Sequence, residues 1–213
     1  MDKTLKIPKA TIKRLSLYYR QLELLEFDGY RMVSSEKMAW LCQVNPAQVR
    51  KDLGYFGEFG VRGVGYDVRE LMHQVKEILA VNRTWNLGIV GLGHLGTALV
   101  HHQNFPSRGF QFVAAFVSDP EKIGQNIGPA LVIRDSKDIP EISREKGIQI
   151  GVIATPAPEA QAVADDLAKG NIHAILNFSR TQVQVPEDCR VEDIDLTIRL
   201  DILTYRLKQE LDM

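Results

Sequence analysis

Apolar residues recur at two different spacings along this 213-residue chain, and the spacing changes near residue 85. Before that point they return every three or four positions, which is the period of an amphipathic helix. This spacing predicts helices at residues 9–27, 46–56 and 67–84, and the core side of the first is formed by Ile12, Leu15, Tyr19 and Leu22. After residue 85 short apolar runs alternate with helical patterns, which is typical of a parallel sheet with helices on its faces. The pattern predicts a helical front domain and an α/β rear domain.

Two short helices joined by a tight turn are predicted in the middle of the front domain. Ser34 and Ser35 offer an N-cap for the first of them. Asn45-Pro46 is a strong start for the second, because asparagine caps helices well and proline fits their first turn. This second helix, residues 46–56, carries amide, basic and phenolic groups away from its apolar face, on Gln48, Arg50, Lys51 and Tyr55. Two helices in this order match a helix-turn-helix, whose second helix enters the major groove of DNA.

The segment GEFGVRGVGY, residues 57–66, places four glycines among valine and aromatic residues. Glycine at this density predicts a β-hairpin or a loop that approaches another backbone closely. Arg62 and Gly63 stand near its tip, and an arginine there can enter the minor groove of DNA. Taken singly, the pair Arg50-Lys51 would be a solvated helix face and Arg62 a surface turn. The order of the elements favours a winged helix that binds DNA.

The most specific motif is GLGHLG, residues 91–96, within WNLGIVGLGHLGTALVHH. A buried strand precedes it and a helix follows it, which is the setting that the GxGxxG dinucleotide-binding motif requires. Gly91 makes the tight turn, Gly93 lets the backbone approach a pyrophosphate, and Gly96 lets the helix pack against the strand. N–H groups at the helix start then bind phosphate oxygens. The alternative is a glycine-rich turn without a ligand.

Three further strands are predicted at residues 110–117, 148–157 and 173–179. The ligand crevice of a parallel sheet lies beyond the carboxyl ends of its strands, and the glycine motif falls at such an end. We therefore expect a single groove for a dinucleotide. The residues expected to bind it are Gly91, Leu92, Gly93, His94, Leu95, Gly96, Val117, Asp119, Thr155, Pro156, Ala157, Asn177 and Phe178.

The last predicted helix, from about Leu196, carries one apolar line of leucines and a second line of Ile198, Ile202 and Tyr205. A helix that is apolar on two sides must be covered on two sides, and the sheet of one subunit can cover only one of them. We expect an obligate homodimer in which this helix is swapped to the partner. The expected domains are a winged helix-turn-helix domain at 1–80, a Rossmann-type parallel sheet domain at 81–195 and a dimerisation helix at 196–213.

Composition and charge narrow the functional class. With 45% hydrophobic and 25% charged residues, the chain has the composition of an ordinary globular protein. It has neither an apolar run near the roughly 20 residues that span a bilayer nor an N-terminal signal core, so we expect a cytoplasmic protein. Cys42 and Cys189 have no metal-ligand spacing, and no metal is expected. Residues 1–80 hold 13 Lys+Arg and 10 Asp+Glu, whereas residues 81–213 hold 13 and 17, so the front domain is the better partner for a polyanion.

The chain closely resembles the Rex family of bacterial redox-sensing transcriptional repressors over essentially its full length. The most specific stretches are IPKATIKRLSLYYR (7–20), VRKDLGYFGEFGVRGVGY (49–66), GLGHLG (91–96), DPEKIG (119–124) and ILNF (175–178). The resemblance implies a homodimer that binds palindromic operator DNA when NADH is scarce and releases it when NADH binds, with NAD+ competing for the same site. Implied DNA contacts are Lys9, Gln48, Arg50, Lys51, Tyr55, Arg62 and Gly63.

The resemblance also implies a set of switch residues. Arg20 and Asp195 match a pair whose contact changes between the two states, although a static ion pair is the alternative. His102 aligns with a tyrosine of the family's switch region, and a histidine differs because its charge can change near neutral pH.

One further position departs from the family pattern. Val117 stands where Rossmann proteins selective for NAD place an acid that binds the adenosine ribose, and no arginine nearby suggests a 2′-phosphate instead. Asp119 either reaches the ribose or caps the following turn, and we favour the cap. Together with His102, this departure predicts weaker or altered dinucleotide affinity with DNA binding intact.

Two other functions stay open on the sequence alone. An NAD-dependent oxidoreductase is the main rival, but the chain left beyond the Rossmann strands is too short for a substrate domain. Because no acid/base pair is placed at the cleft, we expect no catalytic residues and no enzyme activity. The second rival is a DNA-binding dimer insensitive to redox state, whose Rossmann domain binds another nucleotide or only dimerises.

Overall fold

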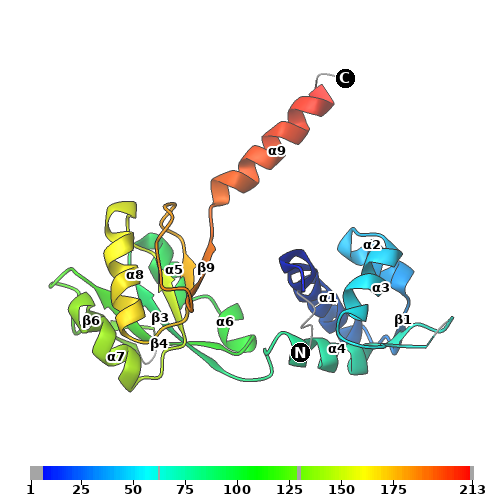
Figure 1. Cartoon of the computed structure of the whole chain (residues 1–213), viewed down its shortest axis with the longest axis horizontal. Helices are drawn as coiled ribbons and strands as arrows, with labels where there is room; N and C mark the ends of the chain where they lie inside the picture. Colours follow the sequence, from blue (N-terminus) through cyan, green and yellow to red (C-terminus); the bar gives the residue numbers. More distant parts are fainter. Residues whose placement is uncertain (1–6, 62, 129–130, 212–213) are drawn as a thin grey trace. The chain divides into compact units, whose positions relative to one another are not determined.

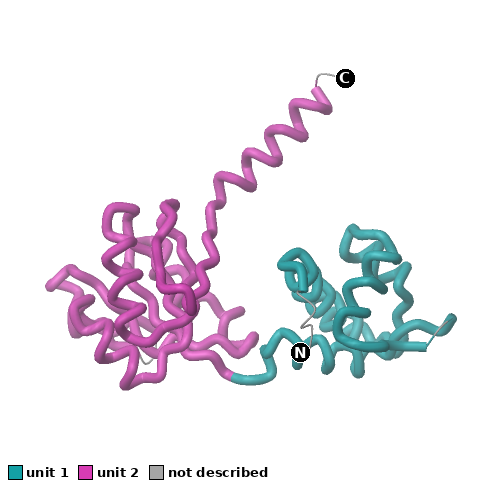
Figure 2. Tube along the Cα trace, viewed as in Figure 1, with its two compact units in different colours: residues 1–83 teal, residues 84–213 magenta. Residues whose placement is uncertain are grey.

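The structure, a computed structural model, describes residues 7–61, 63–128 and 131–211. The chain divides into two compact units, residues 1–83 (unit 1) and 84–213 (unit 2), which are coloured separately in Figure 2. Among the described residues, no helix combines the length and the apolar character needed to cross a bilayer.

Unit 1 is a small helical fold with a two-stranded antiparallel sheet (Figure 1). Its elements are α1 (Lys9–Phe27), β1 (Met32–Val33), α2 (Ser35–Cys42), α3 (Pro46–Gly54), β2 (Tyr66–Asp67) and α4 (Val68–Ile78). The helices that the sequence pattern predicts are all present. Two of them are shorter than predicted, because α3 ends at Gly54 and α4 ends at Ile78.

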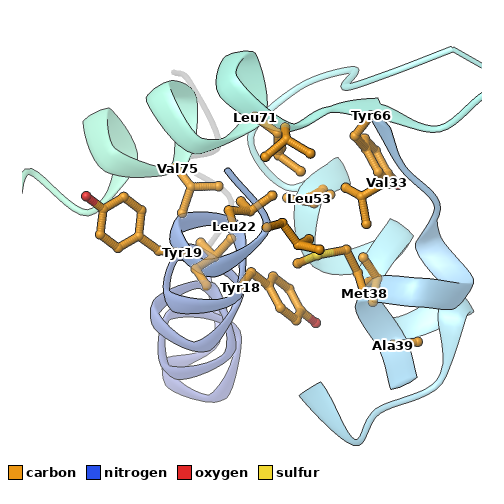
Figure 3. Close-up of a cluster of buried hydrophobic side chains, with 14 residues drawn as sticks. Tyr18, Tyr19, Leu22, Val33, Met38, Ala39, Leu53, Tyr66, Leu71 and Val75 are labelled. Atoms are coloured by element: carbon orange, nitrogen blue, oxygen red, sulfur yellow. The ribbon is translucent and has the colours of Figure 1, made fainter. Parts of the chain in front are cut away.

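The core of unit 1 draws side chains from all four helices, as Figure 3 shows. The buried stripe of α1 differs from the predicted one, because Ile12 is 37% exposed whereas Tyr18 and Thr11 are buried. The physical reason is polar: the hydroxyl groups of Tyr18 and Thr11 both donate to the buried carboxylate of Asp52 on α3. The spacing of apolar residues alone does not reveal a buried helix face that is partly set by hydrogen-bonded polar groups.

Unit 2 is built on a seven-stranded sheet with the order β5-β6-β4-β3-β7-β8-β9. All neighbouring strands are parallel except the pair β5–β6. Without the short β5, the order is that of a Rossmann sheet, which confirms the predicted fold class. The strands are β3 (Trp85–Val90), β4 (Phe110–Val117), β5 (Asn126–Ile127), β6 (Leu131–Asp135), β7 (Ile150–Ile153), β8 (Ala174–Asn177) and β9 (Arg190–Asp193).

Two hydrophobic clusters cover the two faces of this sheet. Alternate residues of β4 belong to different clusters: Phe116 packs with residues of α7 and α8, and Val117 with residues of α5. This alternation is expected of a strand that is buried on both sides. The helical segments of unit 2 are α5 (His94–Val100), α6 (Asn104–Ser107), η1 (Ser136–Asp138), α7 (Ile139–Glu145), η2 (Ala157–Glu159), α8 (Ala160–Lys169) and α9 (Leu196–Leu211).

Helix α9 is exposed along its whole length in the single chain. Its apolar side chains are between 42% and 84% exposed, and they are Leu196, Ile198, Leu200, Ile202, Leu203, Tyr205, Leu207 and Leu211. Exposed apolar side chains that gather along one helix in this way mark a site of association.

Candidate functional site

A groove of about 740 Å³ opens in unit 2 where the strand order reverses, beyond the carboxyl ends of β3, β4 and β7. This is the place where open α/β sheets bind their ligands. The predicted residues that line it are Gly91, Leu92, Gly93, His94, Leu95, Val117, Asp119, Thr155, Pro156, Ala157 and Phe178. Segments far apart in the sequence therefore meet in one groove.

The glycines of the GLGHLG loop have different steric surroundings. Gly91 has φ +95°, and a Cβ atom there would lie 2.7 Å from the carbonyl oxygen of Ala154. A Cβ atom at Gly96 would collide with the carbonyl oxygen of Gly91, so Gly96 lets helix and loop pack closely without lining the groove. At Gly93 a Cβ atom would have no described atom within 4 Å, and the backbone there borders the open groove.

Besides the open backbone at Gly93, the hydroxyl group of Thr155 indicates that the groove takes a polar ligand. Thr155 lines the groove, and its Oγ1 atom is buried without a hydrogen-bond partner among the described residues. A buried polar atom that lacks a partner costs about 1–3 kcal/mol, so it calls for an explanation. A bound molecule with polar groups, such as a dinucleotide, would satisfy it. The open backbone at Gly93 and the hydroxyl of Thr155 thus both fit such a ligand.

Asn177 has a structural role instead of a place in the groove. Its buried amide nitrogen donates to the backbone oxygen of Thr181 (2.7 Å) and to Asp193 Oδ1 (2.8 Å), and its Oδ1 atom accepts from the backbone and hydroxyl of Ser179. With its amide engaged by this loop and by the end of strand β9, Asn177 positions the residues that follow it. Phe178, Ser179 and Arg180 line the groove there.

The end of the groove next to β4 is formed by Val117 and the turn that follows it. Val117 is buried, and the Asp119 Oδ1 atom accepts a hydrogen bond of 3.1 Å from the backbone N–H of Glu121. This bond confirms that Asp119 caps the turn. Sequence reasoning missed three side chains that line the groove here, those of Ser118, Lys122 and Ser136. Ser136 follows strand β6, which the apolar pattern did not predict.

Of the three residues predicted to act as a switch, one lies in unit 1 and two lie in unit 2. His102 is exposed; its Nδ1 atom accepts from the backbone N–H of Asn104 (3.3 Å), and its ring meets Phe105 edge-on at 5.7 Å. Asp195 accepts hydrogen bonds from the hydroxyl of Thr197 (2.7 Å) and from its backbone N–H (2.8 Å); these bonds lower the pKa of Asp195 and cap α9. Arg20 belongs to α1 of unit 1.

Both helices of the helix-turn-helix in unit 1, α2 and α3, begin at the predicted N-cap residues. The hydroxyl of Ser34 accepts a hydrogen bond from the backbone N–H of Lys37 (3.1 Å). The side-chain oxygen of Asn45 accepts one from the backbone N–H of Gln48 (2.7 Å). Between the helices Gln43 takes the left-handed conformation, with φ +54°. A single left-handed residue lets the chain turn sharply and sets the angle at which α3 leaves α2.

The candidate DNA-binding side chains of α3 and of its C-cap, Tyr55, differ in their surroundings. Lys51 and Arg50 are exposed, and Tyr55 is half-buried. The Arg50 guanidinium donates to the Ser35 hydroxyl (2.7 Å) and lies 3.4 Å from Glu36 Oε1, at the start of α2. Lys9, at the first position of α1, is also exposed.

Gln48 faces into unit 1, where the buried carboxylate of Asp52 ties α3 to α1. Gln48 Nε2 donates to Asp52 Oδ1 (2.8 Å), and Arg14 donates to both carboxylate oxygens (2.7 and 2.5 Å). Burial alone would raise the pKa of Asp52, but hydrogen bonds from Arg14, Tyr18, Gln48 and Thr11 outweigh it and hold the pKa below its usual value. A sequence signal existed: Asp52 falls on the apolar side of α3, between Val49 and Leu53.

The glycine-rich segment after α3 forms a short hairpin, closed by a bridge between Val61 and Gly65. Gly65 has φ +109°, and a Cβ atom there would lie 2.6 Å from the carbonyl oxygen of Val33, which confirms the predicted close approach to another backbone. Gly63 lies in the turn of the hairpin and is exposed. Arg62 lies outside the described residues.

Comparison with protein families gives one match for each unit. Residues 6–54 match the family "Putative DNA-binding protein N-terminus", and residues 82–181 match the family "CoA binding domain". Two similar relatives are both named redox-sensing transcriptional repressor Rex. The one from Syntrophobacter fumaroxidans is 53% identical over 95% of this chain and 96% of its own length. The one from Carboxydothermus hydrogenoformans is 47% identical over 98% of this chain and 100% of its own length.

Solved structures give the same result. The crystal structure of RSP in complex with β-NAD+ and operator DNA has a TM-score of 0.91 at 33% identity, and covers 96% of this chain and 94% of that one. The structure of RSP in complex with β-NADH has a TM-score of 0.88 at 31% identity, with 96% of both chains covered. A third structure, of RSP as a Rex-family repressor, has a TM-score of 0.87 at 32% identity, again with 96% of both chains covered.

Proposed function

Because the chain belongs to the Rex family of redox-sensing transcriptional repressors, we propose that it is a homodimeric repressor that NADH releases from operator DNA. The observation that carries this proposal is the union of two parts in one chain: a capped helix-turn-helix and a Rossmann groove that contains an unsatisfied hydroxyl at Thr155. RSP, similar over 96% of the chain, has been crystallised both with operator DNA and with NADH. A repressor of this kind acts in the cytoplasm.

The groove residues would hold the dinucleotide by contacts of three kinds. N–H groups of the GLGHLG loop would bind the pyrophosphate, since Gly93 leaves its backbone open to the groove. The Thr155 hydroxyl would bond a polar atom of the ligand. Val117 and Asp119 would border the adenosine ribose. The reduced nicotinamide is neutral and the oxidised ring is cationic, so a pocket with apolar walls such as Phe178 and Pro156 prefers NADH.

The DNA surface is proposed to centre on the exposed side of α3. Lys51 and Arg50 would contact phosphates or bases in the major groove, together with Tyr55, Lys9, Gly63 and Arg62. Arg50 would exchange its contacts with Ser35 and Glu36 for the DNA. The side-chain amide of Gln48 is engaged by Asp52, so we propose that Gln48 contacts DNA through its backbone and not through its side chain.

Release of DNA requires no chemical reaction. Two recognition helices of a dimer must lie about 34 Å apart to meet successive turns of the major groove. A ligand that binds one arrangement of the subunits more tightly shifts the population toward it, and each 1.4 kcal/mol of difference is worth about tenfold. Arg20, Asp195 and His102 are the residues proposed to distinguish the two arrangements.

The decisive test is a fluorescence-polarisation titration of the operator DNA of the RSP complex with the full-length protein. At fixed salt, since phosphate contacts make affinity depend on salt, NADH is expected to release the DNA at micromolar concentration. NAD+ is expected to be at least about tenfold less effective. Tight DNA binding that neither nucleotide changes would refute redox sensing, and absence of DNA binding would refute the repressor function.

A pair of glycine variants separates ligand contact from packing. Gly93→Ala places a methyl group in the open groove, so we expect weaker NADH binding and an unchanged melting temperature. Gly96→Ala forces the loop away from the Gly91 carbonyl, so we expect destabilisation by about 1–3 kcal/mol, seen as a lower melting temperature. NADH fluorescence and thermal unfolding measure the two effects. If Gly93→Ala bound NADH as tightly as the unaltered protein, the pyrophosphate would not lie at this loop.

A further inference from the structure

We propose that the adenosine end of the groove also accepts a ribose 2′-phosphate, so that NADPH binds this protein with an affinity within about tenfold of that of NADH. The inference rests on the proposed function, because it concerns the same groove and the same class of ligand. It names Val117 as the specificity-determining residue and Lys122 as the cation that faces the phosphate.

The end of β4 lacks the carboxylate that selects NAD in Rossmann proteins. In Rossmann proteins selective for NAD, an acid at this place accepts hydrogen bonds from the ribose hydroxyls, and its charge repels a phosphate on the same ribose. Val117 takes this place here: it is the last residue of β4, is 6% exposed and lines the groove. An isopropyl group neither binds the ribose diol nor repels a 2′-phosphate. Val117 thus removes the usual basis for preferring NADH.

The carboxylate of Asp119, which lines this end of the groove, is already engaged. Asp119 Oδ1 accepts the backbone N–H of Glu121 at 3.1 Å, and its Oδ2 atom lies 3.7 Å from the ammonium nitrogen of Lys122. The Asp119 carboxylate is therefore engaged by its own turn and paired with a positive charge. Asp135, the partner of Val117 in strand β6, turns its carboxylate to the backbone N–H of Lys137 (3.0 Å) and does not line the groove.

The same end of the groove is lined by residues that can donate hydrogen bonds to a phosphate. Lys122, Ser118 and Ser136 all line the groove beside Val117. The side chain of Lys122 is 48% exposed, and its long apolar stem allows the ammonium to reach a phosphate in the groove. One ammonium and two hydroxyl groups form a set that suits a phosphate monoester, for which lysine acts as a point charge.

The test compares NADH with NADPH on the full-length protein, by nicotinamide fluorescence and by thermal shift. We expect dissociation constants within about tenfold of each other for the unaltered protein. Val117→Asp should weaken NADPH by more than about tenfold and leave NADH equal or tighter. Lys122→Ala should weaken NADPH by about tenfold with little effect on NADH. Lys137→Ala, an exposed lysine of η1 outside the groove lining, is the matched control and should change neither.

Adenosine 2′,5′-bisphosphate and AMP, used as competitors, isolate the adenosine end from the nicotinamide. The bisphosphate should displace the bound dinucleotide at least as well as AMP does. In Lys122→Ala the bisphosphate should displace it no better than AMP. If NADH binds and releases DNA while NADPH is weaker by more than about tenfold, the inference fails and the proposed function stands. If neither dinucleotide binds, redox sensing by this groove fails as well.

Discussion

Replacing Asp52 by alanine is expected to lower the free energy of unfolding of unit 1 by about 3 kcal/mol. Asp52 is buried, and its carboxylate accepts hydrogen bonds from Thr11, Arg14 and Tyr18 of α1. Removing it leaves the Arg14 guanidinium without its counter-charge and the two hydroxyls without an acceptor. Because the Arg14 side chain is 23% exposed, water relieves part of this cost, so we expect the lower end of the range for broken buried pairs.

The same substitution should weaken operator binding. Asp52 lies on α3 directly after Lys51 and three residues before Tyr55, the C-cap of the helix, and it fixes this helix against α1. Amide hydrogen exchange of the full chain measures the effect in place: exchange in α3 should accelerate, while β3 in unit 2 should be unaffected. Asp28→Ala, which removes an exposed carboxylate of the same unit, is the control. Unchanged protection of α3 in Asp52→Ala would show that the carboxylate does not anchor the helix.

The pH dependence of unit 1 follows from the lowered pKa of Asp52 in the folded state. A carboxyl group whose pKa falls on folding stabilises the fold above its unfolded pKa of about 3.9, and this contribution is lost as the pH falls through the folded pKa. Protection of α3 should therefore decrease in acid below about pH 4. The Asp52→Asn variant should lack this part of the acid profile.

A charge on the apolar surface of α9 should separate the subunits. Leu203 is 54% exposed in the single chain and is proposed to be buried in the dimer. Burial of a leucine is worth about 1.5–3 kcal/mol, and each dimer contains two copies, so Leu203→Glu should weaken dimerisation by about 10²–10⁴-fold. Operator affinity should fall with it, because a monomer presents only one recognition helix.

Light scattering behind size-exclusion chromatography, over a dilution series, gives the oligomeric state. Gln209→Glu adds the same charge to a polar position of α9 and should leave the dimer intact. If Leu203→Glu dimerised as tightly as Gln209→Glu, α9 would not form the subunit interface. Another apolar surface would then have to be sought.

The elements that short-range patterns specify were predictable, and the contacts between distant residues were not. The apolar run 110–117 coincides with β4, and the leucine-rich end of the chain forms α9 from Leu196. Most of the predicted groove residues line the groove, because a glycine motif and the ends of parallel strands must meet at one edge of the sheet. This part of the site follows from topology.

Polar residues whose side chains are engaged by hydrogen bonds within the protein escaped prediction. Asn177 is the last residue of β8, a position from which side chains often line the groove. Its amide is instead hydrogen-bonded to Thr181 and Asp193. Gln48 lies on the helix expected to contact DNA, but Asp52 engages its amide. Whether a polar side chain meets a ligand or a neighbour is decided by partners that a single sequence does not reveal.

The contact between Arg50 and Glu36 has a consequence for how the operator complex should respond to ionic strength. Binding of a cationic side chain to a DNA phosphate releases a condensed counterion, and each such contact steepens the logarithmic dependence of affinity on salt by about 0.9. Arg50 already faces a carboxylate at 3.4 Å. Its transfer to a phosphate exchanges one anion for another and frees Glu36 to attract a cation from solution. The salt dependence of the complex should therefore be shallower than the number of basic residues on its surface suggests.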